Sequence, residues 1–486
     1  NSEQWRRETA YGFMGFKTSY AALARQIRKS ADAFRTLGVA KGDRVLLCLP
    51  NVPQAIQALY GLNLLGAVAV FAHPLSSEGE LAYYIENSDA KAVVTLKMFA
   101  DKFRTELPVI TNWSKFLRSG KIPAELPAVS ADDPAVILYS GGTTGYPKGI
   151  VLSNLSFNAL ALQTAEAAQC IQRGKCMLAV MPVFHGFGLG ICVHTALVHG
   201  CQCALVPRFS VSTFANLMKK ANYIAGVPTL YEALLSAKEL KRADLSRLMG
   251  VFCGGDTLSP ELKRRFDAFL KERGATVRLR EGYGMTECVT ASCLTPPNAD
   301  DEKEGSIGLP YPDTYYKTLD SGEICLRGPT LMLEYLGNPA LTAEALQRHA
   351  DGHVWLHTGD LGRIDADGYI YFLGRLKRVI VTSGYNVYPP QIERVLNSYP
   401  GIKTSAVIGV PHPYKMQVPK AFIVPADGAE IDLAKLREHL EKNVAKYALP
   451  KEIVTLKAMP TTKIGKVSYS VLEEDYAEFL PQSPKN

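Results

Sequence analysis

The first hundred residues alternate between amphipathic and wholly apolar segments. Apolar side chains recur at steps of three and four residues from Tyr20 to Phe34, so they predict a helix that ends at Gly38. Alternating strands and helices are expected to follow, at 44–49 (strand), 54–65 (helix), 67–70 (strand), 78–87 (helix) and 92–95 (strand). This alternation predicts an α/β fold of largely parallel strands whose faces are covered by helices.

The same rhythm continues to about residue 253 and later changes. Further buried strands are expected at 135–138, 177–181, 203–206 and 251–253. From about Ile364 the pattern predicts short strands separated by glycine turns, at 369–372, 379–381, 406–410 and 421–424, and helices at 389–397 and 433–444. Because 486 residues are too many for one hydrophobic core, we expect two domains. The first, 1–376, is large and contains mixed parallel sheets and helices, and the second, 377–486, is a small α+β domain.

Composition narrows the class of protein. Apolar residues make up 47% and charged residues 21%, as in ordinary globular proteins. The net charge of +7 forms no block of Lys and Arg, which favours anionic small molecules over nucleic acid as partners. The ten cysteines include no CxxC pair, so they are interpreted as buried thiols of a reducing compartment, without disulfides or a zinc motif. The longest apolar stretch, Leu62–Ala72, is too short to cross a bilayer, and we expect a cytoplasmic protein.

One loop carries most of the candidate chemistry. Residues 139–149 read Tyr-Ser-Gly-Gly-Thr-Thr-Gly-Tyr-Pro-Lys-Gly, directly behind the apolar segment 135–138. Glycines bring backbone N–H groups close to an anion, hydroxyls donate hydrogen bonds and a lysine adds charge. The loop is not a Walker A motif, because Tyr146 and Pro147 intervene and Gly149 follows the lysine. It predicts a polyphosphate site, with a flexible surface turn as the alternative, formed by Ser140, Gly141, Gly142, Thr143, Thr144, Gly145 and Lys148.

Six further motifs follow the loop along the chain. They are Met-Pro-Val-Phe-His-Gly-Phe-Gly (181–188), Gly-Tyr-Gly-Met-Thr-Glu (282–287), Trp-Leu-His-Thr-Gly-Asp-Leu-Gly (355–362), Gly-Arg-Leu-Lys-Arg (374–378), Ser-Gly-Tyr-Asn-Val-Tyr-Pro (383–389) and Pro-Thr-Thr-Lys-Ile-Gly-Lys-Val (460–467). Together with the loop they resemble the acyl-adenylate-forming (AMP-binding) superfamily, which includes acyl-CoA synthetases, peptide synthetase adenylation domains and firefly luciferase. Gly141 stands where many members carry serine, a variant that looks most similar to fatty acyl-CoA synthetases.

This resemblance implies a two-step reaction that uses ATP, Mg²⁺ and coenzyme A. A carboxylate is a poor electrophile, so the family first joins it to AMP with release of pyrophosphate, and a thiol then displaces AMP. Positioning and electrostatics do most of the catalysis in such steps. The resemblance assigns Glu287 and Thr143 to magnesium, and Thr286 to the α-phosphate. Outside such a motif, a lone glutamate in a loop is usually only solvated.

The resemblance also assigns the rest of the nucleotide site. Tyr283 is expected to stack on adenine, beside a wall formed by Gly254, Gly255 and Gly284. A carboxylate can accept hydrogen bonds from two adjacent hydroxyls, so Asp360 suits the ribose, with Arg375 as a cationic partner nearby. Without the motif, these residues would be interpreted as turn packing and as a helix or turn cap.

Three residues connect the small domain to the reaction. The resemblance assigns Lys466 to a bridge between the substrate carboxylate and the α-phosphate, although an exposed lysine is ordinarily solvated surface. Lys377 occupies the position at which the family bends between its two domains, so the C-terminal domain is expected to be mobile. Gly384 matches a residue of the pantetheine tunnel, where a missing side chain lets the thiol arm pass.

The segment after Phe184 predicts the class of acid substrate. Residues 184–193 contain no acidic side chain to pair with an ammonium group, so an α-amino acid is disfavoured. The glycines Gly186, Gly188 and Gly190 are interpreted as the start of a helix that lines an apolar acyl channel, with His185 near its mouth or, alternatively, packed in the core. We expect an acyl-CoA synthetase for a medium- to long-chain fatty acid. The alternatives are an aryl-acid or carrier-protein ligase, or a nucleotide-binding regulator without catalysis.

Overall fold

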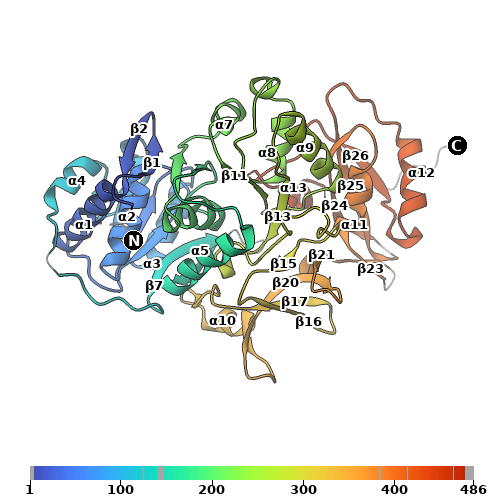
Figure 1. Cartoon of the computed structure of the whole chain (residues 1–486). Helices are drawn as coiled ribbons and strands as arrows, with labels where there is room; N and C mark the ends of the chain where they lie inside the picture. The colour runs from blue at the N-terminus through green and yellow to red at the C-terminus, as the bar shows by residue number, and fades with distance from the viewer. Residues whose placement is uncertain are drawn as a thin grey trace.

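The computed structural model describes residues 5–123, 125–140, 147–382, 385–412, 414–462 and 465–476. It has a mixed α/β architecture, with a large N-terminal domain and a smaller C-terminal domain, as expected (Figure 1). The C-terminal elements gather on one side of the molecule, opposite the N-terminal helices α1 (Tyr20–Thr36) and α4 (Trp113–Ser119) (Figure 1). No helix among the described residues is long and apolar enough to span a membrane.

The largest sheet has nine strands in the order β15-β14-β13-β12-β11-β9-β10-β1-β2. The strands from β13 to β1 run parallel, whereas β2, β14 and β15 join antiparallel at the edges. The strands are β1 (Thr9–Phe13), β2 (Phe16–Ser19), β9 (Cys176–Ala179), β10 (Gln202–Leu205), β11 (Tyr223–Gly226), β12 (Gly250–Cys253), β13 (Leu279–Tyr283), β14 (Cys293–Leu294) and β15 (Leu309–Pro310).

A second sheet has seven strands in the order β18-β8-β7-β4-β3-β5-β6. Its central strands are parallel and buried, as their apolar sequences predict. The strands are β3 (Arg44–Cys48), β4 (Val68–Phe71), β5 (Ala90–Thr95), β6 (Val109–Ile110), β7 (Pro134–Ser140), β8 (Lys148–Ser153) and β18 (Glu334–Tyr335). The strands β7 and β8 form an antiparallel pair, with Ser140 opposite Lys148, so the predicted phosphate loop connects their ends. Its residues Gly141, Gly142, Thr143, Thr144 and Gly145 lie outside the described residues.

Helix α1 shows how the local sequence determines an element. The Ser19 side chain accepts a hydrogen bond from the Ala22 N–H and caps the first turn, and Gly38 follows the last turn with a φ of +93°. Its apolar stripe buries Leu23, Ala31 and Phe34. The other helices are α2 (Pro53–Leu64), α3 (Glu78–Ser88), α5 (Asn154–Ala168), α6 (Ala196–Val198), α7 (Val211–Met218), α8 (Pro228–Leu235), α9 (Pro260–Glu272) and α10 (Pro339–Ala345), with short 3₁₀ turns η1 (Lys97–Lys102) and η3 (Lys238–Leu240).

The glycine-rich segment after His185 forms a helix, as expected, and its first part is the π-helix η2 (Phe187–Thr195). The packing around it is close. A Cβ at Gly188 would lie 2.2 Å from the Pro182 carbonyl oxygen, and one at Gly186 would lie 1.8 Å from the Val289 carbonyl oxygen. These glycines therefore let neighbouring backbone approach the helix, and π-helical turns are often found at functional sites.

A third sheet joins the two domains and is antiparallel throughout. Its order is β16-β17-β20-β19, and β21 also pairs with β20. The strands are β16 (Tyr315–Thr318), β17 (Glu323–Arg327), β19 (Leu346–Arg348), β20 (Val354–Ile364) and β21 (Ile370–Arg375). The predicted domain boundary between Leu376 and Lys377 falls in the 3₁₀ turn η5 (Leu376–Arg378) that follows this sheet.

The C-terminal domain has its own sheet, in the order β23-β22-β25-β24, with β26 parallel to β25. Two short strands were expected at 406–410 and 421–424, and this was wrong in length. They are the buried centres of a long hairpin, and the apolar pattern missed its ends because these are more exposed and carry polar side chains such as Lys403, His412 and Gln417. The elements are β22 (Ile380–Thr382), β23 (Tyr385–Val387), β24 (Ile402–His412), β25 (Met416–Pro425), β26 (Glu452–Thr455), α11 (Pro389–Asn397), α12 (Leu433–Asn443), α13 (Tyr469–Tyr476) and η6 (Lys446–Ala448).

Candidate active site

A cavity of about 1620 Å³ lies between the two large sheets, the third sheet and the C-terminal domain. Every predicted site residue that the structure describes lines it, although these residues come from distant parts of the chain. They are Ser140, Lys148, His185, Gly254, Gly255, Tyr283, Gly284, Thr286, Glu287, Asp360, Arg375, Lys377 and Lys466. Gly384, like residues 141–145, lies outside the described residues.

Lys148 and Glu287 both contact the side chain of Tyr335. The Lys148 Nζ lies 5.1 Å from the centre of the Tyr335 ring, which is cation–π range, and the Tyr335 hydroxyl donates a 2.8 Å hydrogen bond to Glu287 Oε1. Tyr335 reaches this position because β18 pairs with β8, opposite Ile150. A buried carboxylate and a lysine thus share one aromatic side chain at the end of the phosphate loop.

Glu287 lies in the tight 3₁₀ turn η4 (Thr286–Cys288), which follows β13. The turn is held against the chain that comes after it, since a Cβ at Gly284 would lie only 2.0 Å from the Thr290 carbonyl oxygen. The backbone also fixes Glu287, whose carbonyl accepts a hydrogen bond from the Met332 N–H. Among the described residues, no hydrogen bond reaches Oε2, so this oxygen is available to a ligand.

Asp360 is the centre of a second polar group. It lies opposite Arg375 in the β20–β21 pair, with its Oδ1 3.4 Å from Arg375 Nε, and its Oδ2 accepts a 2.6 Å hydrogen bond from the Tyr283 hydroxyl. Burial raises the pKa of Asp360, while Arg375 and the Tyr283 hydroxyl oppose that shift. Tyr283, expected to stack on adenine, is thus also held by its hydroxyl group beside the predicted ribose ligand.

Lys466 reaches the cavity from the C-terminal domain. Its loop is attached to the N-terminal domain by a 3.1 Å hydrogen bond from the Thr229 hydroxyl to the Gly465 carbonyl. A Cβ at Gly255 would lie 3.2 Å from Lys466 Cε, so the lysine side chain passes over this glycine. Burial lowers the pKa of Lys466, Asp256 raises it and Arg375 lowers it further. No described carboxylate forms an ion pair with Nζ, which leaves the ammonium group for a bound anion.

His185 borders the cavity near Lys466. Its Nδ1 accepts a 3.2 Å hydrogen bond from the Phe187 N–H, so the neutral ring carries its proton on Nε2. Burial, followed by the charge of Lys466, lowers the pKa of His185 to about 3. The imidazole is therefore neutral near pH 7 and can donate one hydrogen bond from Nε2 without adding charge.

The cavity also has an apolar end. We define the acyl end by Ile171, Met177, Phe187, Ile191, Phe252 and Leu294, which line the cavity and belong to one hydrophobic cluster. They come from η2, from strands of the largest sheet and from the segment after α5. We define the nucleotide end by the polar residues around Glu287, Asp360 and Lys466. No charged side chain is among the residues that define the acyl end.

Lys377 itself is exposed, but its neighbour Arg378 is held. The Arg378 guanidinium lies 3.2 Å from the centre of the Tyr469 ring and 3.9 Å from Glu393 Oε1. Burial raises the pKa of Glu393 to about 7, and Arg378 opposes that shift. The predicted hinge is therefore flanked by a contact within the C-terminal domain.

Sequence reasoning missed three polar residues of this site. Tyr335 links Lys148 with Glu287, Asp256 is the acidic neighbour of Lys466, and Glu323 accepts hydrogen bonds from the Gly359 N–H (2.9 Å) and His357 Nδ1 (3.1 Å). Asp256 directly follows Gly254-Gly255, which could have drawn attention to it. Tyr335 and Glu323 stand in short strands, and no local pattern distinguishes them.

Comparison with known proteins agrees with this geometry. Residues 1–336 match the AMP-binding enzyme family, and residues 391–466 match the AMP-binding enzyme C-terminal domain. A feruloyl-CoA synthase of Amycolatopsis sp is 32% identical over 479 residues, which cover 94% of this chain and 94% of the relative. A long-chain-fatty-acid–CoA ligase of Bacillus subtilis (strain 168) is 31% identical over 529 residues, with 97% and 92% coverage.

Among solved structures, ATP-bound MatB from Rhodopseudomonas palustris has a TM-score of 0.90 and 27% identity, covering 98% of this chain and 97% of that chain. Sequence, fold and cavity therefore point to one family, and the expected superfamily is confirmed. The chain belongs to the AMP-binding enzyme family and is an AMP-forming acid–CoA ligase, a class that uses ATP and CoA.

Proposed function

We propose that this ligase activates a medium- to long-chain fatty acid. The supporting observation is the acyl end of the cavity, where apolar side chains such as Ile191 and Phe252 from one hydrophobic cluster line the wall. Burying an unpaired ammonium or second carboxylate there would cost several kcal/mol, so an acid with an apolar body is favoured. The resemblance to a long-chain-fatty-acid–CoA ligase is in line with this choice.

In the first step, the carboxylate oxygen of the acid attacks the α-phosphate of ATP, and the bond to pyrophosphate breaks. The proposal assigns Lys466 to hold the carboxylate and the α-phosphate together, and it is supported by an ammonium group that has no ion-pair partner among the described residues. It assigns Thr286, which lines the same cavity, to the α-phosphate, and His185 to donate from Nε2 as negative charge shifts between the oxygens. Asp360 and Arg375 hold the ribose.

Magnesium fits the donors at Glu287. Tyr335 occupies only Oε1 of this carboxylate, and Mg²⁺ prefers oxygen ligands together with substrate phosphates. We propose that Glu287 holds the ion through Oε2, together with Thr143. When bound, the ion supplies positive charge next to the phosphates.

In the second step, the thiol of CoA attacks the acyl carbon and AMP leaves. We propose that the C-terminal domain, 377–486, rotates about Lys377 between the steps. This motion would withdraw Lys466 and bring Gly384 to the thiol path. Among the described residues of the Lys466 loop, Gly465 is attached to the N-terminal domain by the hydrogen bond from Thr229, and such a contact is compatible with release.

A panel of acids tests the substrate proposal. Pyrophosphate release is measured with decanoate, palmitate, cinnamate, 4-hydroxycinnamate and phenylalanine, each with and without CoA. The expected result is the highest kcat/KM with a fatty acid, AMP formation that depends on CoA, and no turnover of phenylalanine. A preference for either aromatic acid over both fatty acids would overturn the proposal.

An aryl acid is the second candidate, and Thr164 favours it. This threonine of α5 lines the cavity, is 5% exposed, and its hydroxyl has no hydrogen-bond partner among the described residues. It lies close enough to the Tyr311 phenol to affect the pKa of that group, but the two do not form a hydrogen bond of normal geometry. A hydroxyl group of the substrate would supply the missing hydrogen-bond partner of the Thr164 hydroxyl. In that case Thr164→Val would lower kcat/KM for 4-hydroxycinnamate but not for cinnamate or decanoate.

A further inference from the structure

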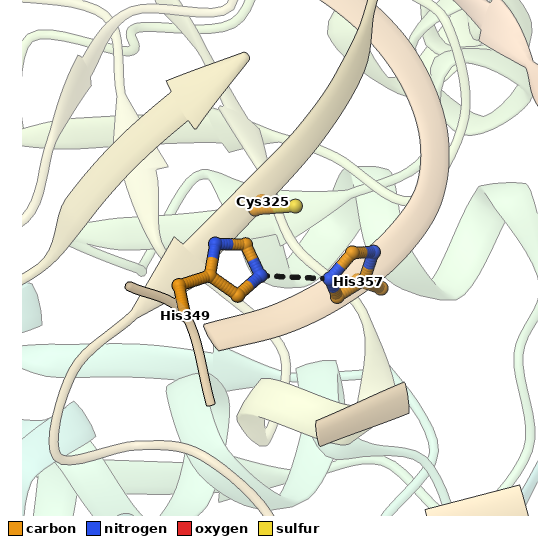
Figure 2. Close-up of side chains that lie close together, drawn as sticks. All are labelled: Cys325, His349 and His357. Carbon is orange, nitrogen blue, oxygen red and sulfur yellow. Dashed lines mark hydrogen bonds between the residues drawn. The ribbon is translucent and has the colours of Figure 1, made fainter. Parts of the chain in front are cut away.

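Two histidines and a cysteine meet in the third sheet, and one of them, His357, also lines the active-site cavity. Cys325 of β17 lies directly opposite His357 of β20 in the antiparallel pair, so their side chains share one face. His349 lies in the turn that joins β19 to β20, and Figure 2 shows its ring directed at His357 with the Cys325 sulfur beside both. The Cys325 Sγ and one nitrogen of each ring all lie within 4.8 Å of one another.

The hydrogen bonds direct one imidazole lone pair, that of His357 Nε2, into this cluster. Glu323 Oε2 accepts a 3.1 Å hydrogen bond from His357 Nδ1, so the neutral His357 ring carries its lone pair on Nε2. That lone pair faces His349 Nε2 at 2.9 Å (Figure 2). A carboxylate behind a histidine is the usual support of a histidine that binds a metal. The Cys325 thiol is fully buried and makes no hydrogen bond among the described residues.

The surroundings hold the three side chains in place. The His349 carbonyl accepts a 2.9 Å hydrogen bond from the Gly352 N–H, which fixes the turn, and the His349 ring stacks on Trp355 at 6.0 Å. Lys317, a cation close to the cluster, has its Nζ 4.1 Å from the centre of the Trp355 ring and 3.4 Å from Asp351 Oδ2. Its charge is therefore partly neutralised by Asp351, and Glu323 adds a second negative charge beside the cluster.

We propose that Cys325, His349 and His357 form a binding site for one Zn²⁺ ion or a similar borderline-soft divalent cation. A tetrahedral Zn²⁺ with bonds of about 2.0–2.3 Å keeps its ligand atoms roughly 3.3–3.6 Å apart. Small side-chain movements bring the three ligand atoms, which lie within 4.8 Å of one another, to these distances. On binding, the Cys325 thiol gives its proton to solvent, the His349 proton moves from Nε2 to Nδ1, and water fills the fourth position.

This site is distinct from the proposed magnesium site. Thiolate and imidazole ligands select zinc-like ions, whereas Mg²⁺ requires oxygen ligands such as the Glu287 carboxylate. The two sites are nevertheless connected through the backbone. Glu323 holds His357 with one oxygen and the Gly359 N–H with the other, and Gly359 precedes Asp360. An ion in the cluster would therefore stabilise the position of β20, the strand that contains the predicted ribose ligand Asp360.

Cobalt tests the proposal directly. The full chain is stripped with a chelator and titrated with Co²⁺ alone while its absorption spectrum is recorded. We expect a thiolate-to-cobalt charge-transfer band that saturates at one equivalent, is abolished by Zn²⁺ and is unaffected by excess Mg²⁺. A spectrum without this band at one equivalent would overturn the proposal.

Variants identify the ligands. Removing a supporting group typically weakens metal affinity about 10–100-fold, so loss of a ligand in His349→Asn should weaken Zn²⁺ binding at least about 100-fold in competition with a chromophoric chelator. The matched control is His353→Asn, an exposed histidine of the same turn, which should bind Zn²⁺ like the wild type. Cys325→Ser should lose the charge-transfer band.

Folding of each variant is checked by its thermal unfolding without metal. If Cys325→Ser does not fold, the comparison of His349→Asn with His353→Asn decides. Equal Zn²⁺ affinity in those two variants, or a band that persists in folded Cys325→Ser, would mean that the cluster is only a hydrogen-bonded histidine pair beside a buried thiol.

Discussion

The nucleotide end and the acyl end of the cavity are built in opposite ways. At the nucleotide end, charged side chains such as Glu287, Asp360 and Lys466 converge from both domains. Tyrosine hydroxyls donate hydrogen bonds to Glu287 and Asp360, and Arg375 forms an ion pair with Asp360. At the acyl end, apolar side chains from one hydrophobic cluster pack around the π-helix η2. A fixed reaction requires fixed charges, whereas a hydrophobic surface tolerates substitution of one apolar residue for another. Reaction and acid selectivity should therefore be separable by mutation.

The largest effect is expected from Lys466→Ala. Loss of a single charge-stabilising donor costs about 10²–10³-fold, and we expect about 1000-fold slower adenylation with every acid. Conversion of supplied acyl-AMP and CoA to the thioester should persist, because we propose that Lys466 acts only in the first step. Separate assays of the two half-reactions measure this. Lys457→Ala, an exposed lysine of the same domain, is the control. Equal loss of both half-reactions would refute the assignment.

Glu287→Gln should come next. It keeps the shape of the side chain but removes the charge proposed to hold magnesium, so adenylation should slow on the order of 100-fold and require more Mg²⁺. The control is Glu334→Gln, an exposed glutamate next to Tyr335. Initial rates over a range of Mg²⁺ concentrations provide the measurement, and an unchanged Mg²⁺ dependence would place the metal elsewhere.

Ile171→Phe tests the acyl end of the cavity. Ile171 is partly buried at the acyl end, and a larger ring there narrows the space for long acids. A misfit of this size in a hydrophobic pocket typically changes selectivity about 10-fold, so the ratio of kcat/KM for decanoate to that for palmitate should rise by this factor. The KM for ATP should stay the same. A shift in the KM for ATP without a change in this ratio would contradict the separation of the two ends.

Tyr335→Phe should have a smaller effect. It removes the hydroxyl that donates to Glu287 but keeps the ring beneath Lys148. A hydrogen bond to a charged group contributes about 1.5–3 kcal/mol, and part of this returns when water or a metal replaces the hydroxyl. We expect about a 5-fold higher Mg²⁺ requirement with all acids affected equally. Acid-dependent effects would mean that Tyr335 also contacts the acyl group.

The smallest expected effect is a shift in the pH dependence of kcat/KM for ATP. The pKa of Lys466 is lowered by burial, and the proposed role requires its protonated form. We therefore expect kcat/KM for ATP to decline with rising pH below the ordinary lysine value of 10.5. The pKa of Asp360 is raised by burial, and the proposed role requires its ionised form, so the acidic decline should begin above pH 3.8. Lys466→Arg keeps its charge at high pH and should move the alkaline decline upward. An unmoved alkaline decline would assign it to another group.

The sequence by itself determined the fold class, the helices with clear periodicity and the reaction family. Phosphate chemistry accepts few residue types, so the glycines, hydroxyls and Lys148 of one short loop predict a phosphate site. The stripe from Tyr20 to Phe34 predicted α1 because local caps and periodicity agree. All described members of the predicted site line one cavity.

Only the tertiary structure decided the contacts across strands. Tyr335 reaches Glu287 through the β18–β8 pairing, and Cys325 meets His357 through the register of β17 with β20. The π-helix η2 likewise depends on the backbone that packs against Gly186 and Gly188. Strand register is set by the packing of whole sheet faces. Residues far apart in the chain therefore become neighbours although no local sequence pattern predicts the contact.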